Sequence, residues 1–176
     1  MTKILIGSSS WTDPTLIACG RFYPGDCRTP EARLRFYASQ FPIVEVDSSY
    51  YGMPTPQNAV AWAARTPEDF VFNVKAFRLF TGHQTPSDKL HKDIQQALGP
   101  GGARTIHYKD TPGEIRDELW RRFVEALAPL KQAGKLGAVH FQFAPWVIRN
   151  RDGMAHVREC ALRMAGHEVA VEFRNK

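Results

Sequence analysis

The sequence predicts an α/β fold in which parallel strands alternate with outer helices and form part of a barrel, truncated after about five strands. Two observations predict it. Strand-like and helix-like segments alternate strictly along the 176 residues, which is the order of βαβ units. The strands also carry polar residues on one face, which fits the interior of a barrel better than a sheet with helices on both faces. We expect a single domain over residues 1–176.

The first half of the chain contains three predicted strands. Residues 4–7, 43–47 and 70–75 are short apolar or β-rich runs bounded by turn formers. Two helices between them begin at Thr29-Pro30 and Thr55-Pro56, where threonine caps the helix and proline suits its first turn. These helices are expected to end before Pro42 and Pro67.

In the second half, residues 78–112 are predicted to be irregular, with a short helix over residues 90–98. Thr111-Pro112 repeats the cap signal and opens a helix over residues 113–132, with apolar residues on one stripe. Strands follow over residues 136–143 and 168–174, with a helix over about residues 152–165 between them. An irregular segment as long as residues 78–112 is typical of a functional or mobile loop.

Composition and charge exclude several classes of protein. Hydrophobic residues make up 43% and charged residues 23%, as in ordinary globular proteins. No apolar run approaches the ~20 residues of a membrane span, and no signal peptide is recognisable, so we expect a cytoplasmic protein. The net charge is +5, but the densest basic stretch, Arg116 to Arg122, contains acids as well, so nucleic-acid binding is not expected. The odd count of three cysteines predicts ordinary thiols.

The predicted strands place polar residues in phase. In strands, alternate residues share a face, so Glu45 and Asp47 lie together, as do Asn73 and Lys75. The fourth and fifth predicted strands repeat the pattern with one pair each, His140 with Gln142 and Glu172 with Arg174. Glu45 with Lys75, or Glu172 with Arg174, could simply be structural ion pairs. Buried charges are costly even when paired, so four such strands favour a site at the carboxyl ends.

Short motifs are spread over nearly the whole chain. They are Gly7-Ser8-Ser9-Ser10-Trp11, Phe22-Tyr23-Pro24, the run from Val44 to Tyr51, Arg65-Thr66-Pro67, the run from Phe70 to Lys75, and Val171-Glu172-Phe173-Arg174. Together these motifs resemble those of the YecE-like family, domain of unknown function 72. The resemblance implies a TIM-type barrel and no established activity. The family continues beyond the residue matching Arg174 with further strands, so the resemblance implies that this chain is a truncated barrel.

The polar cluster supports acid–base chemistry. We predict four catalytic residues, Glu45, Lys75, Glu172 and Arg174, since carboxylates beside cations can act as bases and the cations can hold an anion. Eight further residues are predicted to bind substrate: Ser8, Ser9, Trp11, Asp47, Tyr50, Asn73, His140 and Gln142. No cofactor is required by the sequence. A divalent metal is not favoured because Lys75 and Arg174 would repel it.

Three functional hypotheses remain open from the sequence. The first is an enzyme, hydrolase- or lyase-like, acting on a small anionic or sugar-like ligand. The second is a non-catalytic nucleotide or nucleic-acid binding module. The third is an inactive truncated barrel. A barrel stopped after its fifth strand also leaves two open edges. We expect that the missing strands come from another chain, or that the isolated chain self-associates or is poorly stable.

Overall fold

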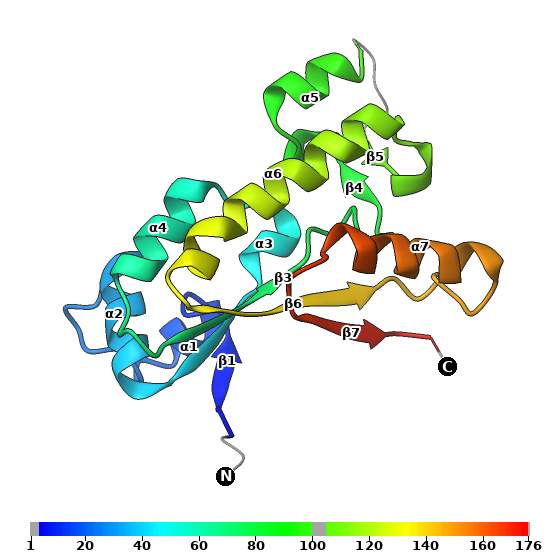
Figure 1. Ribbon diagram of the computed structural model, residues 1–176. Coiled ribbons are helices and arrows are strands. Elements are labelled where there is room, and N and C mark those ends of the chain that lie inside the picture. The colour runs from blue at the N-terminus through cyan, green and yellow to red at the C-terminus, as the bar shows by residue number, and fades with distance from the viewer. Residues whose placement is uncertain (1–3, 100–104, 176) are drawn as a thin grey trace.

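A computed structural model describes residues 4–99 and 105–175, and its centre is one sheet of five parallel strands (Figure 1). The strands lie in the order β1-β2-β3-β6-β7, with the bounds Gly7–Ser9, Ile43–Val46, Val71–Lys75, Leu136–Phe143 and Val169–Phe173. The predicted α/β class with a parallel sheet is confirmed. The sheet is open in the described residues, with β1 and β7 as its two edges.

The connecting helices lie along one side of the sheet (Figure 1). They are α2 (Pro30–Gln40), α4 (Pro56–Ala64), α6 (Gly113–Gln132) and α7 (Arg151–Arg163). The strand order follows the chain without a reversal. Because crossovers between parallel strands are right-handed, an order without reversal puts every crossover on the same face. The opposite face of the sheet, which we call the inner face, therefore carries no helix from these crossovers.

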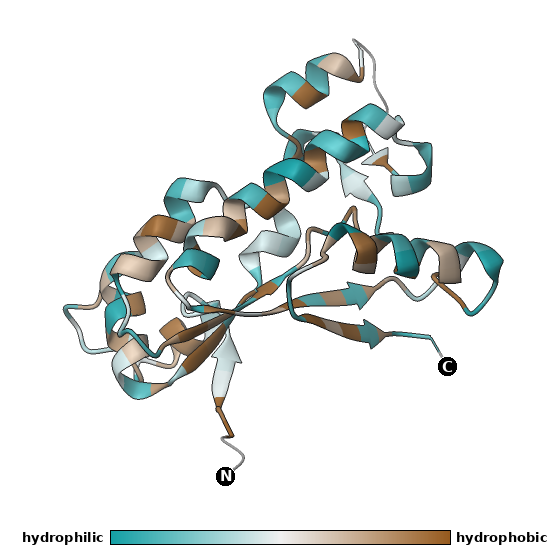
Figure 2. Cartoon of the chain, viewed as in Figure 1, coloured by the Kyte–Doolittle hydropathy of each residue, from teal (hydrophilic) through white to brown (hydrophobic). Residues whose placement is uncertain are grey.

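The hydrophobic core lies between the sheet and these helices. Val44, Val46, Phe72, Val74 and Phe141 point into it from the strands and are fully buried. The α6 helix supplies the other wall with its apolar stripe, Ile115, Leu119, Phe123, Leu127 and Leu130, all buried as the helical spacing predicts. Figure 2 shows the resulting mixture of hydrophobic and hydrophilic residues around α6.

Two of the three predicted caps are confirmed. Thr29 Oγ1 accepts a hydrogen bond from Ala32 N at 3.1 Å, and Thr55 Oγ1 accepts one from Asn58 N at 3.2 Å. The third prediction is wrong, because Pro112 itself occupies the cap position of α6. Thr111 Oγ1 instead donates to the carbonyl of His107 at 2.9 Å, which stabilises the turn before the helix.

The first strand begins later than predicted. The sequence predicts a strand over residues 4–7, whereas β1 covers Gly7–Ser9. β1 pairs with β2 from Gly7 opposite Ile43 onward, and Ile43 is the first residue of β2. Residues 4–6 consequently have no partner strand on that side. Ile4 and Ile6 are 82% and 69% exposed, so they are not the buried strand residues that their hydropathy suggested.

The predicted irregular region between β3 and α6 contains small elements. They are β4 (Thr85–Pro86), η1 (Ser87–Lys89), α5 (Lys92–Ala97), β5 (Thr105–Ile106) and η2 (Tyr108–Asp110), with β4 and β5 paired antiparallel. The α5 helix confirms the short helix predicted there. Two other short helices, α1 (Pro14–Ala18) and α3 (Ser48–Tyr51), were not predicted, because one turn of helix carries no periodic signal.

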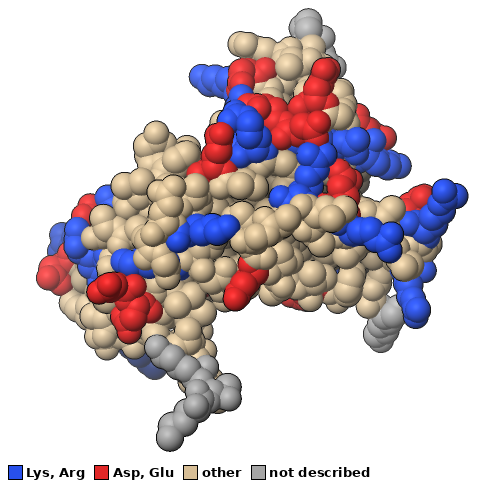
Figure 3. Space-filling view, viewed as in Figure 1, with Lys and Arg blue, Asp and Glu red and all other residues tan. Residues whose placement is uncertain are grey.

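Basic and acidic side chains alternate on the surface of α6, as predicted for a solvated helix face. Arg121 pairs with Glu118 at 2.7 Å and with Glu125, and Arg122 pairs with Glu118 at 2.6 Å and with Asp93 of α5. Figure 3 shows both signs of charge interspersed over the visible face. No helix within the described ranges is long and apolar enough to cross a membrane.

Candidate functional site

Polar side chains on the inner face meet where the strands end. His140 of β6 stands between two carboxylates: its Nδ1 lies 2.8 Å from Glu45 Oε2 and its Nε2 lies 3.3 Å from Glu172 Oε2. Glu45 comes from β2 and Glu172 from β7. All three side chains are partly exposed. We call Glu45, His140 and Glu172 the carboxylate–histidine cluster.

The Glu172 carboxylate has two further neighbours on the same edge. Gln142 Nε2 donates to both of its oxygens at 2.9 Å, because Gln142 and Glu172 are opposite each other in the β6–β7 register. Arg174 Nε lies 3.6 Å from Glu172 Oε1. Glu172 is thus oriented by an amide while half of its side chain stays accessible, an arrangement that suits a reacting group.

Lys75 lies beside this cluster and is bound to a different carboxylate. Its Nζ donates to Asp47 Oδ1 at 2.9 Å, and the side chain is only 13% exposed. The ammonium also lies 5.1 Å from the centre of the Tyr50 ring, a cation–π distance. The direct pair between Glu45 and Lys75, considered from the sequence, is therefore replaced by Lys75–Asp47 and by Glu45–His140.

The electrostatics of the cluster favour a charged imidazole. Hydrogen bonding to Glu45 raises the pKa of His140, the attraction of Glu45 and Glu172 raises it further, and burial opposes both. The hydrogen bond from His140 lowers the pKa of Glu45, again against the effect of burial. The cluster therefore holds a proton on His140 at a higher pH than an isolated histidine would.

Two residues at the edge were not among the predicted site residues. Arg78 places its guanidinium 5.4 Å from the Tyr50 ring centre, and its Nε is buried without a hydrogen-bond partner in the described residues. His83 makes an edge contact with Tyr50 at 5.3 Å, and its Nδ1 is 2.9 Å from Thr81 Oγ1. Both lie just after β3, at the start of the segment predicted to be irregular, where strand periodicity cannot place a side chain.

Ser8 and Trp11, predicted to bind substrate, lie on the other face of the sheet. Ser8 Oγ is 2.9 Å from the hydroxyl of Tyr37, a buried residue of α2. The Trp11 indole is buried against Trp62 and Phe72, at ring distances of 5.7 and 6.4 Å. Both residues therefore stabilise the packing between helices and sheet, apart from the carboxylate–histidine cluster.

Ser9 and Asn73, in contrast, reach the inner face beside Glu45. Ser9 Oγ donates to Glu45 Oε1 at 3.4 Å, and Asn73 Oδ1 accepts a hydrogen bond from Ala138 N at 2.9 Å. A hollow of about 320 Å³ lies against these residues. Within the described part of the chain, no group of three or more histidine, cysteine and acidic side chains is arranged to hold a metal ion.

The fold and the site define a class: a parallel α/β protein with helices on one face and a polar cluster at the carboxyl ends of its strands. Comparison with known families places the chain more narrowly. Residues 5–176 match the family described as "Protein of unknown function DUF72", and the chain belongs to this family.

Individual relatives agree with this assignment. The chain is 32% identical over 173 residues to the UPF0759 protein YunF of Bacillus subtilis. The match covers 98% of this chain and 51% of that protein. A solved DUF72 protein of Enterococcus faecalis V583 shares the fold with a TM-score of 0.66 at 23% identity over 98% of this chain and 51% of the other. A solved DUF72 protein of Thermotoga maritima MSB8 shares the fold with a TM-score of 0.65 at 23% identity. The match covers 98% of this chain and 56% of the other. The chain thus spans about half the length of these relatives.

Proposed function

We propose that this chain carries the carboxyl-edge site of an enzyme, hydrolase- or lyase-like, that acts on a small anionic or sugar-like substrate. The observation that carries the proposal is His140 held between Glu45 and Glu172, at 2.8 and 3.3 Å. An imidazole with a raised pKa can protonate a leaving oxygen near neutral pH, and a neighbouring exposed carboxylate can accept a proton. Structural ion pairs also perturb pKa values, but here the groups are accessible on an uncovered face.

The cluster can serve two related reactions. In hydrolysis, Glu172 accepts a proton from an attacking water, and His140 donates one to the oxygen that leaves. In elimination, Glu172 removes the proton next to the anionic group, and His140 protonates the departing hydroxyl, so that water leaves and a double bond forms. Glu45 is a positioning residue in both, because its hydrogen bond orients the ring and stabilises the imidazolium.

The cations beside the cluster support an anionic substrate group. Lys75 and Arg78 both approach the Tyr50 ring, at 5.1 and 5.4 Å. Arg174 lies near enough that it joins them in lowering the pKa of His83, for which burial is the largest cause. Lys75 is already paired with Asp47, whereas Arg78 Nε has no hydrogen-bond partner in the described residues. Arg78 can therefore bind a carboxylate or phosphate in bidentate fashion.

We also propose that the sheet is part of a TIM-type barrel. The strand order without reversal and the helices on one face are the geometry of such a barrel. Its active sites lie at the carboxyl ends of the strands, which is where Glu172 and Lys75 stand. A cytoplasmic location belongs to the same proposal, since Cys19, Cys27 and Cys160 are free thiols.

A substrate screen with this chain tests the proposal. The panel contains nitrophenyl phosphates, nitrophenyl glycosides and small hydroxy acids. Turnover is measured by the release of nitrophenol or by the absorbance of a new double bond. We expect turnover of one class that falls by about 100-fold or more in His140→Asn and in Glu172→Gln. Glu125→Gln, on the exposed face of α6, is the matched control and retains activity.

Turnover that survives both substitutions would overturn the catalytic assignment. Binding of AMP or of an oligonucleotide without turnover of any substrate in the panel would favour the non-catalytic alternative instead. The mixed charges on the face in Figure 3 form no continuous basic stripe, so oligonucleotide binding is not the expected result.

A further inference from the structure

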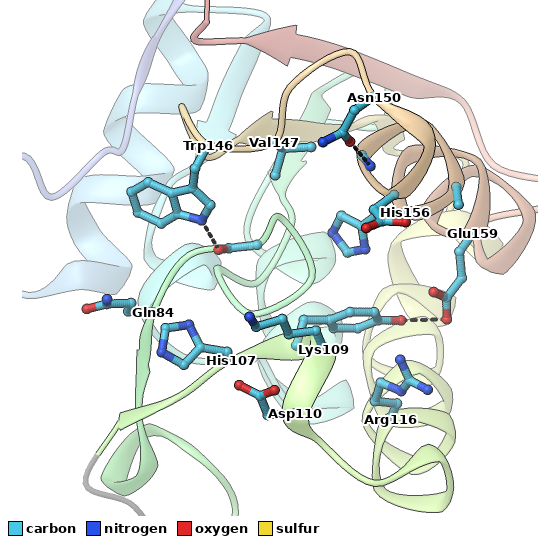
Figure 4. A pocket seen from close by; sticks show the side chains of 15 residues that line it. Gln84, His107, Lys109, Asp110, Arg116, Trp146, Val147, Asn150, His156 and Glu159 are labelled. Atoms are coloured by element: carbon cyan, nitrogen blue, oxygen red, sulfur yellow. Dashed lines mark hydrogen bonds between the residues drawn. The ribbon is translucent and has the colours of Figure 1, made fainter.

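A second hollow lies outside the carboxylate–histidine cluster, between α7 and the segment that carries β4 and η2. Its volume is about 760 Å³, within the range of small-molecule sites. Figure 4 shows two facing walls, formed by Trp146 and Asn150 on one side and by Gln84, His107, Lys109 and Asp110 on the other. We call this hollow the Trp146 pocket.

The Trp146 indole is an exposed aromatic surface with a fixed orientation. The side chain is 58% exposed, yet its Nε1 donates to the carbonyl of Gly82 at 2.8 Å. His83 packs against it at a ring distance of 5.8 Å and an angle of 67°. A large aromatic ring that is held in place but left uncovered provides a platform for a flat ligand. Trp11 and Trp120, by comparison, are buried in the core.

The backbone at Gly82 makes this orientation possible. Gly82 has φ +80°, and an added Cβ would lie 2.9 Å from Val147 Cγ2. Only glycine adopts such a conformation readily and leaves room for Val147, which lines the pocket next to Trp146. The carbonyl that holds the indole therefore depends on a residue that the neighbouring packing restricts to glycine.

The polar groups of the pocket suit hydroxyls better than an anion. Lys109 and Gln84 supply donors, while Asp110 and Asp152 supply acceptors. Phosphate oxygens only accept hydrogen bonds and would be repelled by the two aspartates and by Glu159, another residue of the lining. A hydroxyl both donates and accepts, so a ligand with several hydroxyls can use groups of both kinds.

Two further charged residues of the lining, Glu159 and Arg116, both contact Tyr108. Glu159 Oε1 accepts a hydrogen bond from the Tyr108 hydroxyl at 2.7 Å, and the Arg116 guanidinium lies 5.2 Å from the centre of the Tyr108 ring. Arg116 thus lies against the Tyr108 ring at a cation–π distance, and its buried Nε has no hydrogen-bond partner in the described residues. Figure 4 shows Arg116 and Glu159 at one end of the pocket, away from Trp146.

We propose that the Trp146 pocket binds a neutral pyranose sugar. One ring lies with its apolar C–H face on the indole of Trp146, and its hydroxyls bond to Gln84, Lys109 and Asp110. The pocket has room for a mono- or disaccharide. This binding site is separate from the carboxylate–histidine cluster and does not require that cluster to be catalytic.

Calorimetry and saturation-transfer NMR with the whole chain test the proposal. The probes are glucose, galactose, N-acetylglucosamine, maltose and cellobiose, with AMP as the anionic aromatic comparison. We expect at least one sugar to bind to the unsubstituted protein. The same sugar should bind about tenfold more weakly to Trp146→Leu, because leucine keeps the apolar bulk but not the flat face. Trp146→Phe keeps a flat face and should bind better than Trp146→Leu. Lys89→Ala, a lysine of η1 outside the pocket lining, is the control and should bind as the parent does.

Several results would overturn the proposal. They are binding of no sugar in the panel, sugar binding that Trp146→Leu leaves unchanged, or AMP binding that Trp146→Leu abolishes while no sugar binds. Thermal melts of both Trp146 variants separate a loss of binding from a loss of folding. Sugar binding retained in Glu172→Gln supports a separate site, and its loss there would contradict one. The proposal can thus succeed or fail independently of catalysis at Glu172.

Discussion

His140 Nδ1 lies 2.8 Å from Glu45 Oε2, although the two residues are 95 positions apart and come from strands that are not neighbours. β3 lies between β2 and β6. Strands two places apart are about 9.5 Å from each other, so two such side chains meet only if they lean together over the strand between them. The contact shows that the inner face brings side chains together over β3.

This pair makes stability depend on pH. Contacts in the folded state raise the pKa of His140, so its protonation stabilises the fold. This stabilisation is fully present below pH 6.5, the ordinary pKa of histidine, and is lost as the pH rises through the raised pKa. The ionised Glu45 carboxylate, whose pKa is lowered, likewise stabilises the fold. This stabilisation is fully present above pH 4.5, the ordinary pKa of glutamate, and is lost as the pH falls through the lowered pKa. Between about 4.5 and 6.5 both contributions are present.

We therefore expect His140→Gln to reduce the free energy of unfolding by about 1–2 kcal/mol near pH 5.5 and by much less near pH 9. Urea unfolding at the two pH values measures the difference. His91→Gln, at the start of α5, is the control and should show no such dependence. An equal loss at both pH values would contradict a charged pair.

Gly137→Ala should destabilise the sheet. A Cβ there would lie 2.7 Å from Val71 Cγ1 and closer still to Asn73 Oδ1, which accepts the hydrogen bond from Ala138 N. We expect a loss of about 1–3 kcal/mol, measured by denaturant unfolding. Gly25→Ala, which has open space around it, should change stability little. Equal stability of the two variants would show that the inner face adjusts without cost.

Lys135→Met should weaken the end of α4. Lys135 is buried, and its Nζ donates to the carbonyls of Ala63 and Thr66 at 2.6 and 2.8 Å. Methionine fills a similar volume but removes both of these hydrogen bonds, so we expect a loss of about 2 kcal/mol by thermal or urea unfolding. The matched control is Lys131→Met, which removes one exposed bond to Gly166 and should cost less than half as much. A reversed order would refute the capping role.

The polypeptide of residues 1–176 should self-associate through the open edge at β7. Val171 and Phe173 are 46% and 54% exposed on that strand, and an exposed apolar edge is a template for pairing. Sedimentation velocity should show oligomers that Val171→Lys reduces, whereas Val60→Lys on α4 leaves them unchanged. A compact monomer with a sharp, cooperative melt for the unsubstituted chain would contradict this prediction.

The sequence alone determined which residues share a face and at which end of the sheet they lie. Alternation is a local property of extended backbone, so Glu45, Lys75, Gln142 and Glu172 could be assigned to one face from their spacing. The order of strands and helices likewise predicted the parallel sheet. The start of β1 could not be predicted, because it depends on where Ile43 offers a partner rather than on the hydropathy of residues 4–6.

Only the tertiary structure decided which partner each side chain takes. Lys75 pairs with Asp47 and Glu45 pairs with His140 because strand register and the approach of side chains over β3 set those distances. Contacts such as Trp146 with Gly82, and Arg78 with Tyr50, join segments outside the sheet whose relative positions follow from packing. Periodicity describes one segment at a time, whereas a site is assembled from several, and the relative positions of those segments are fixed by the packed core.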